Sequence, residues 1–196
     1  MLTAKQAQEL MKLEGNARGV AFRIDHDNII EMFGKDSVKK VEDYIKKIGI
    51  DMNYESFRNT ALYPIGLRFI SLIAIKDVFK LADNDIKKMG FKAPRVSFIV
   101  KLFTRAFLSV DALLTRANII WQKHFNGSLK VIKYNKQKKF IIAQLEGFVS
   151  HKIFCVYLGG YFESIVSLTL SSNKITVKEI ICDNQKGIHQ FKLNWK

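Results

Sequence analysis

The last third of the chain has an order of strand-like and helix-like segments that few folds accommodate. Residues 129–134 and 140–148 are rich in β-branched and aromatic residues, and the five polar residues between them suit a hairpin loop. Residues 175–182 and 188–195 have the same strand-like composition. Between the two pairs, Ser150 can cap a helix whose apolar residues recur every three or four positions: Phe154, Tyr157, Leu158, Tyr161 and Ile165. We therefore predict the order strand, strand, helix, strand, strand.

These four strands are predicted to form one antiparallel sheet with a single apolar face. In the last strand, alternation places His189, Phe191, Leu193 and Trp195 on the same side. An apolar sheet face needs a cover, and almost all of the remaining chain has a helical pattern. A short helix is predicted from Asp83 to Gly90, and a long one from Pro94 to about Lys123.

The predicted fold class is therefore α+β, with a helical layer packed on a four-stranded antiparallel sheet. The 196 residues suggest a single domain, 1–196, made of a helical part, 1–127, and a ββαββ part, 128–196.

The net charge indicates which classes of partner the protein could bind. Lys and Arg number 32 against 18 acidic residues, which gives +14 and raises the hypotheses of a nucleic-acid partner and of an anionic membrane. Most of the excess is Lys scattered along the predicted helices, which is typical of a solvated surface. The hairpin carries a basic cluster that we interpret as protection of a sheet edge: Lys130, Lys133, Lys136, Lys138 and Lys139. Nucleic acid is therefore not the expected partner.

Cysteine content and hydropathy indicate a location. The only two cysteines, Cys155 and Cys182, exclude a disulfide framework and favour a cytoplasmic protein. The apolar run 61–75 contains Pro64 and Arg68, and no uninterrupted span of 18 apolar residues occurs, so no transmembrane segment is predicted.

Several segments of the last third resemble one protein family. The segments that carry the resemblance are 146–148 (EGF), 155–161 (CVYLGGY), 179–182 (EIIC), Gly187 and 191–195 (FKLNW). They look like the 4-vinyl reductase domain family and its uncharacterised bacterial relatives, as does the segment 120–125. This family shares a superfamily with the TRAPP subunits of Golgi transport and the haem nitric oxide sensor domains.

The resemblance implies an apolar cavity between the helices and the sheet, in which relatives hold a small apolar ligand or an acyl chain. Its expected volume is a few hundred Å³, the lower range of ligand pockets, and the inward sheet face and the long helix should supply its lining. These expected ligand-binding residues are Phe103, Phe107, Leu114, Tyr157, Tyr161, Phe191, Leu193 and Trp195. Tyr134, Tyr157 or Tyr161 could orient a ligand head group.

Enzyme chemistry has little support in the sequence, and no catalytic residue is predicted. The chain has no glycine-rich dinucleotide fingerprint, no Gly-x-Ser-x-Gly and no His-Glu-x-x-His. The local cluster Asp25-His26-Asp27 is a poor acid–base site, because neighbouring residues seldom converge on one substrate.

Cys155, Cys182 and His189 are the candidate metal ligands. Many relatives carry three cysteines, and His189 occupies the position of the third, two residues before Phe191. A Cys-Cys-His set can ligate zinc. Buried free cysteines are also common as small apolar residues, so we expect a structural role for both and no metal.

Haem is not expected as a cofactor either. The related nitric oxide sensors use a His on the helix before the sheet and a Tyr-x-Ser-x-Arg motif in the hairpin. Here the predicted helix from Pro94 has no His until His124, and the hairpin sequence 134–138 (YNKQK) lacks the Ser and the Arg.

The function predicted from the sequence is a non-enzymatic binding or sensor module for an apolar small molecule or lipid. The alternative is a structural or protein-interaction adaptor, like the TRAPP subunits, with a filled core. The apolar stretch 64–78 adds the prediction of a homodimer formed through helices. A haem gas sensor and a nucleic-acid binder are the less favoured alternatives.

Overall fold

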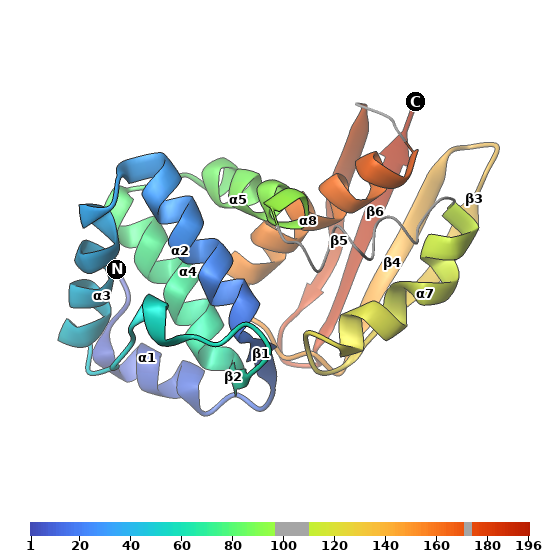
Figure 1. The fold of residues 1–196 in the computed structure, drawn as a ribbon. Coiled ribbons are helices and arrows are strands. Elements are labelled where there is room, and N and C mark those ends of the chain that lie inside the picture. The colour runs from blue at the N-terminus through green and yellow to red at the C-terminus, as the bar shows by residue number, and fades with distance from the viewer. Residues whose placement is uncertain (97–109, 171–173) are drawn as a thin grey trace. The chain divides into compact units, whose positions relative to one another are not determined.

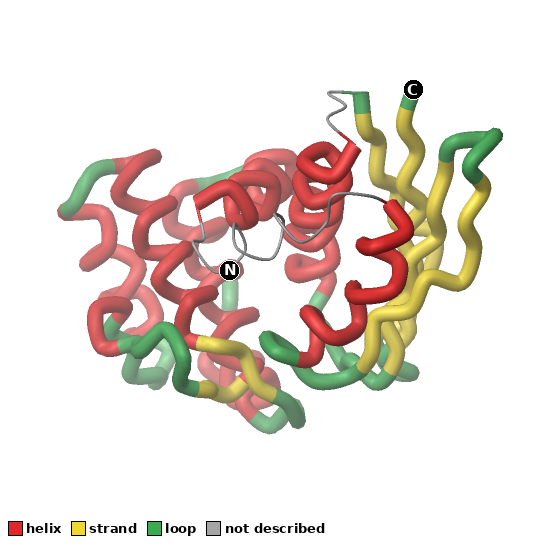
Figure 2. Tube along the Cα trace, turned by 45° about the vertical axis from the view of Figure 1, so that its right-hand side comes forward, coloured by secondary structure: helices red, strands yellow, loops and turns green. Residues whose placement is uncertain are grey.

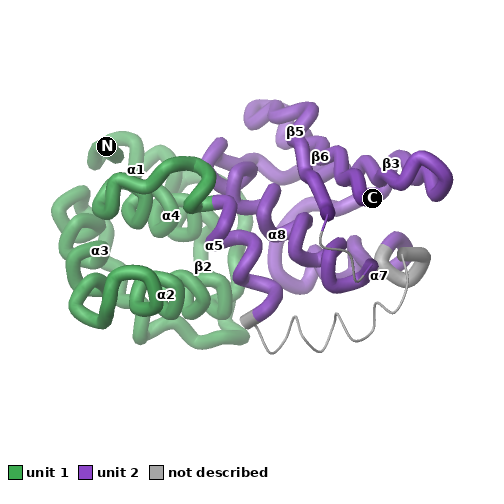
Figure 3. Tube along the Cα trace, turned by 90° about the horizontal axis from the view of Figure 1, so that it is seen from above, with its two compact units in different colours: residues 1–86 green, residues 87–196 purple. Residues whose placement is uncertain are grey.

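The structure is a computed structural model that describes residues 1–96, 110–170 and 174–196. Helices make up the first part of the chain, and a four-stranded antiparallel sheet lies in the second (Figure 1). The predicted α+β fold class is therefore confirmed. The chain divides into two compact units, Met1–Ile86 (unit 1) and Lys87–Lys196 (unit 2), which Figure 3 colours separately. The boundary differs from the predicted division at residue 127, and the single domain stays a prediction.

Unit 1 is a set of helices with one small sheet. The 3-10 helix η1 and the strands β1 and β2 are short, and β1 pairs antiparallel with β2. The elements are α1 (Ala4–Met11), β1 (Asn16–Arg18), α2 (Gly19–Phe33), α3 (Asp36–Lys47), η1 (Tyr54–Ser56), β2 (Leu62–Pro64) and α4 (Ile65–Phe79).

Helix α4 is the core of unit 1. Ten of its 15 residues are buried, because α1, α2 and α3 all pack against it. This helix contains most of the apolar stretch from which the sequence predicted a homodimer. Since the neighbouring helices already cover the stretch, it no longer supports dimerisation, which stays a prediction.

A buried polar network joins α2 to α4 inside unit 1. The Arg68 guanidinium donates to the carboxylate of Asp25, and both side chains are almost fully buried. The hydroxyl of Ser71 donates to the same carboxylate oxygen at 2.6 Å, and Tyr54 Oη lies 2.7 Å from Ser71 Oγ. Burial raises the pKa of Asp25, while the guanidinium acts in the opposite direction. This pairing explains how an arginine can interrupt so apolar a helix.

Unit 2 contains the predicted strand pairs in the order β3-β4-β6-β5, all antiparallel. The hairpin loop between β3 and β4 lies where it was predicted, and Asn135 Oδ1 accepts a hydrogen bond from the Lys138 amide at 2.7 Å. The elements are α5 (Asp83–Val96), which begins in unit 1, α7 (Val110–Gln122), β3 (Ser128–Asn135), β4 (Phe140–Glu146), α8 (Lys152–Leu170), β5 (Ile175–Asp183) and β6 (Ile188–Trp195).

The sheet has one covered face, called here the inner face, and one outer face. Alternate residues of β4 and β6 are buried, which confirms that His189, Phe191 and Leu193 share a side. Helix α8 packs on β5 and β6, and α7 packs on β3, so both helices lie on the inner face (Figure 2). Each edge strand has a β-bulge, between Val131 and Lys133 in β3 and between Glu179 and Ile181 in β5.

Helix boundaries around Pro94 were predicted wrongly. Helix α5 does not end at Gly90 but continues to Val96, and Pro94 lies inside it rather than at the start of the next helix. The glycine was taken as a stop signal, but here it serves a close contact between helices. The predicted helix residues 97–109 lie outside the described part of the chain.

Helix α8 passes the length and composition test for a membrane span, with a mean hydropathy of 1.5 over its most apolar window. Half of that window is buried inside the molecule, and core helices of globular proteins pass the same test. We therefore describe α8 as the central helix of unit 2.

Two glycines let α5 and α8 cross with their backbones in contact. A Cβ at Gly90 would collide with the carbonyl oxygen of Tyr157, and a Cβ at Gly160 would collide with that of Lys87. Gly159, the neighbour of Gly160 on α8, has nothing within 4 Å of its Cβ position. A Cβ is therefore excluded at Gly160 but has room at Gly159, although the two residues are adjacent in α8.

We predict opposite effects of alanine at these two positions. Gly160→Ala forces α5 and α8 apart and should lower the free energy of unfolding by about 2 kcal/mol or more, as overpacked cores do. Gly159→Ala should leave it unchanged or raise it by roughly 0.5–1 kcal/mol, since alanine favours a helix. Urea unfolding of both variants measures this, and equal stabilities would contradict the close crossing.

Candidate functional site

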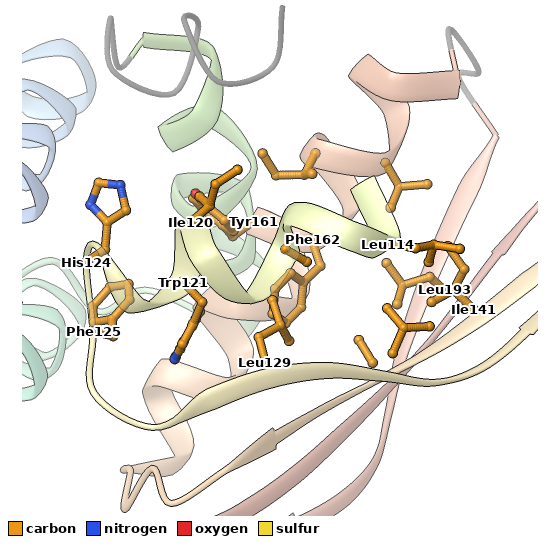
Figure 4. A pocket seen from close by; sticks show the side chains of 15 residues that line it. Leu114, Ile120, Trp121, His124, Phe125, Leu129, Ile141, Tyr161, Phe162 and Leu193 are labelled. Atoms are coloured by element: carbon orange, nitrogen blue, oxygen red, sulfur yellow. The ribbon is translucent and has the colours of Figure 1, made fainter. Parts of the chain in front are cut away.

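An apolar cavity lies in unit 2 between α7, α8 and the inner face of the sheet. Its volume is about 80 Å³. Figure 4 shows Trp121, His124 and Phe125 toward one end of it, and Leu193 and Ile141 toward the other. Apolar side chains make up almost all of its wall: Leu114, Ala117, Ile120, Trp121, Phe125, Leu129, Val131, Ile141, Ala143, Phe162, Ile165, Val166 and Leu193, with His124 and Tyr161.

Few polar groups reach this cavity. The indole N–H of Trp121 is already used, because it donates to the Asn126 carbonyl at 2.9 Å. Burial raises the pKa of Tyr161 to about 12, so its hydroxyl keeps its proton at neutral pH and could donate a hydrogen bond. His124 supplies the other polar side chain. The cavity therefore favours an apolar molecule with at most one or two hydrogen-bonding groups.

The structure places some of the expected ligand-binding residues at the cavity and others elsewhere. Leu114, Tyr161 and Leu193 line it. Phe191 and Tyr157 belong to the core around it, where Phe191 packs edge-on against Phe162 and Tyr157 stacks on Phe154. Trp195 is half-buried at the end of β6 and stacks on Tyr134. Phe103 and Phe107 lie outside the described residues.

Sequence reasoning missed the end of the cavity formed by Trp121, His124 and Phe125. Trp121 lies in the last turn of α7, and His124 and Phe125 follow that helix. This segment was noted for its family resemblance but was not assigned to the pocket. Ile141 and Ala143 lie two residues apart in β4, so strand alternation could have assigned both to the same inner face. The cavity is also smaller than the few hundred Å³ expected.

A second site brings Cys155, Cys182 and His189 together, and adds Glu179. One potential ligand atom from each of the four residues lies within 4.8 Å of all the others. Cys155 and His189 are buried, Glu179 is half-buried and Cys182 is exposed. The convergence that a metal site requires is thus present, although we expected separate structural cysteines. Ligation itself stays a proposal.

The separations within this cluster fit a tetrahedral zinc centre. Cys155 Sγ lies 3.7 Å from Cys182 Sγ and 3.3 Å from His189 Nδ1. Two thiolates that bind one zinc ion at about 2.3 Å are about 3.8 Å apart at the tetrahedral angle. With four protein ligands the site would be closed, which is typical of structural rather than catalytic zinc.

The surroundings of the cluster prepare its donors. His189 Nε2 lies 3.1 Å from the Phe148 carbonyl, which fixes Nε2 as the protonated nitrogen and leaves the Nδ1 lone pair directed at Cys155. Burial lowers the pKa of His189, so the ring is neutral at pH 7. Burial, with the nearby Glu179 charge, raises the pKa of the Cys155 thiol, so metal binding must release its proton.

The bulge in β5 makes this cluster possible. Cys182 comes three residues after Glu179, so in a regular strand their side chains would point to opposite faces. The extra residue between Glu179 and Ile181 shifts the alternation, and Cys182 then pairs with His189 while Glu179 pairs with Phe191. Both side chains therefore reach the inner face. The sequence shows the residues of this motif but not the bulge, so Glu179 was missed.

Comparisons with known proteins support the fold. No protein-family model matches the chain, and no curated protein sequence does. Solved H-NOX structures match over 91% of the chain. One is an H-NOX protein from S. oneidensis in the Fe(II)NO ligation state, with a TM-score of 0.65, 10% identity and 99% of its own chain covered. Another is an oxygen-binding H-NOX domain related to soluble guanylate cyclases, with a TM-score of 0.61, 13% identity and 95% of its own chain covered. An unliganded Fe(II) H-NOX mutant from K. algicida gives a TM-score of 0.62 at 14% identity, covering 96% of that chain. At these identities the likeness shows the fold alone.

Haem, which the description of another matching structure names, does not fit the described residues of this chain. A cavity of about 80 Å³ is several-fold too small for a porphyrin. None of its lining residues is an arginine or lysine that could meet the propionates, and His124 is the single histidine among them. In the hairpin, Tyr134 stacks on Trp195 rather than standing beside an arginine.

We predict that the cysteine cluster binds one Zn²⁺ per chain. Co²⁺, used as a spectroscopic substitute, should give thiolate-to-metal absorption, and Cys182→Ser or His189→Gln should weaken zinc binding by more than about 100-fold, since even outer-shell changes cost 10–100-fold. Asp183→Asn and His26→Gln are matched controls outside the cluster and should bind normally. Absence of thiolate-to-cobalt absorption in the unmodified, reduced protein would rule the site out.

Proposed function

We propose that unit 2 is a sensor module that holds one compact apolar molecule in its cavity. The single observation that carries this proposal is a cavity whose wall, among the described residues, is made almost wholly of carbon. The family resemblance of the last third of the chain, to the 4-vinyl reductase domain family, points the same way. So does the fold shared with H-NOX sensors of small gaseous ligands.

The cavity selects for size and for polarity. A dry cavity of about 150 Å³ lined by leucine, isoleucine and phenylalanine accepts benzene or xenon. The cavity described here is smaller, at about 80 Å³, so a single ring or a short branched chain is the upper limit of size. The Tyr161 hydroxyl could orient one oxygen or nitrogen of the ligand, because it is protonated at neutral pH.

Ligand binding would act by stabilising the packing of α7 and α8 on the sheet. Lining residues come from both helices and from β3, β4 and β6, so a ligand would contact α7, α8 and three strands of the sheet. A molecule that binds only when α7 and α8 are packed on the sheet raises the population of that packed state, to which a partner can then bind. This mechanism needs no catalytic group, and we propose that the protein is not an enzyme and acts in the cytoplasm.

The zinc proposal complements the sensor proposal. A closed metal centre on α8, β5 and β6 would fix one end of α8, whose middle turns line the cavity. The metal would then have a structural role, because its ligands would join these separate elements at one point. The adaptor alternative, with a filled core, has no specific observation in its favour.

We predict that toluene binds in this cavity and raises the melting temperature by mass action. Trp121 lines the cavity and Trp195 does not, so in a Trp195→Phe background the emission of Trp121 alone should change on binding. Ala143→Phe should fill the space and abolish both effects. Ile142→Phe adds a ring at the next residue of β4, on the outer face, and should preserve them.

The same two measurements can contradict the proposal. If saturating toluene, p-cresol and xenon leave the melting temperature and the Trp121 emission unchanged in the folded parent protein, the cavity is not a binding site. The adaptor function would then take the place of the sensor.

A further inference from the structure

The net charge of the protein is confined to unit 2. This unit holds 19 of the 32 Lys and Arg residues but only 5 of the 18 acidic ones. Unit 1 has 13 of each, so it is neutral, and the whole excess of +14 falls on the second unit. The basic residues are spread about evenly over the two units, so the scarcity of acidic residues gives unit 2 its excess of positive charge.

Within unit 2, lysines gather at one end of the sheet. Residues 133–142, 174–178 and 192–196 contain eight lysines and no acidic residue. Strand pairing brings these segments together: Ile175 is the partner of Trp195, and the Trp195 amide donates to the Lys139 carbonyl at 3.2 Å. We call this region the lysine end. It comprises Lys133, Lys178 and Lys192 on the outer face, Lys136, Lys138 and Lys139 at the hairpin, and Lys174 and Lys196 beside them.

The outer-face lysines lie in one row across the sheet. Lys133 pairs with Ile142, Ile142 with Lys192, and Lys192 with Lys178. Like charges directly opposite each other on neighbouring strands destabilise a sheet. Lys133, Lys178 and Lys192 form no ion pair in the described part of the chain. This row of lysines therefore adds no ion pair to the sheet. An anionic partner would neutralise its positive charge.

We propose that the lysine end of unit 2 docks on the surface of an anionic lipid bilayer. Each lysine near such a surface adds attraction, and clusters of four to eight are typical of peripheral binding. Long lysine stems can keep their ammonium groups at the headgroups while apolar neighbours approach the lipid. Ile142 and the half-buried Phe140 lie among the outer-face lysines, and Trp195 and Tyr134 lie at the same end.

The observations favour lipid over nucleic acid. Single-strand binding needs free aromatic rings on which bases can stack. Here the Phe140 ring is covered by the ammonium of Lys192 at 5.0 Å and that of Lys133 at 5.8 Å, and Tyr134 and Trp195 stack on each other. Arginine, which suits paired contacts to phosphates and bases, does not occur after Arg116.

Vesicle flotation with the full chain tests the proposal. We expect binding to phosphatidylcholine vesicles that contain phosphatidylserine, none to phosphatidylcholine alone, and loss of binding at high salt. The variant Lys136→Glu/Lys138→Glu/Lys178→Glu should lower the partition coefficient at least about tenfold. It should remain folded, because the carboxylate introduced at position 178 would face Lys192 as an opposite charge.

A matched variant separates the lysine end from net charge. Lys5→Glu/Lys35→Glu/Lys40→Glu, on exposed positions of unit 1, lowers the formal charge by the same amount, from +14 to +8. It should bind anionic vesicles nearly as well as the parent. Equal losses in both variants, no vesicle binding by the parent, or binding to a single-stranded or duplex oligonucleotide in place of vesicles would each overturn the proposal.

Discussion

Unit 2 depends on the packing of α8 against both α5 and the sheet. Gly160 lets the backbone of α8 touch α5 on one side, while Phe154, Phe162 and Val166 face the core on the other. Hydrophobic burial holds this arrangement, since ten residues of α8 are buried. The position of α8 then decides where the cavity opens and where Cys155 meets the strands.

Both candidate sites follow from that one helix. Cys155, near the start of α8, meets Cys182 and His189 of β5 and β6. Further along, Tyr161 and Phe162 form one wall of the cavity, opposite Trp121 of α7. A metal would thus fix the first turns of α8, and a ligand would support its middle. The proposed sensing mechanism is a change in how firmly this helix packs on the sheet.

The strand pattern predicted the sheet well, because alternation and the polar hairpin loop are local signals. They placed Phe191 and Leu193 on the inner face, where the structure has them. Three features depended on contacts between distant segments and could not be read locally. Gly90 looked like a helix stop but is a crossing point, the bulge that turns Glu179 inward has no sequence signature, and the apolar surface of α4 is covered by its own unit. The cavity wall at Trp121 depends on the turn after α7, which pattern analysis does not place.

Native mass spectrometry of the protein, purified from cells without detergent, shows directly whether the cavity holds a ligand. We expect gentle ionisation to show the polypeptide with one small organic molecule, which collisional activation or the Ala143→Phe substitution removes. A parent protein that carries no organic molecule, in spectra that retain a known non-covalent ligand of a control protein, would contradict a binding function for the cavity.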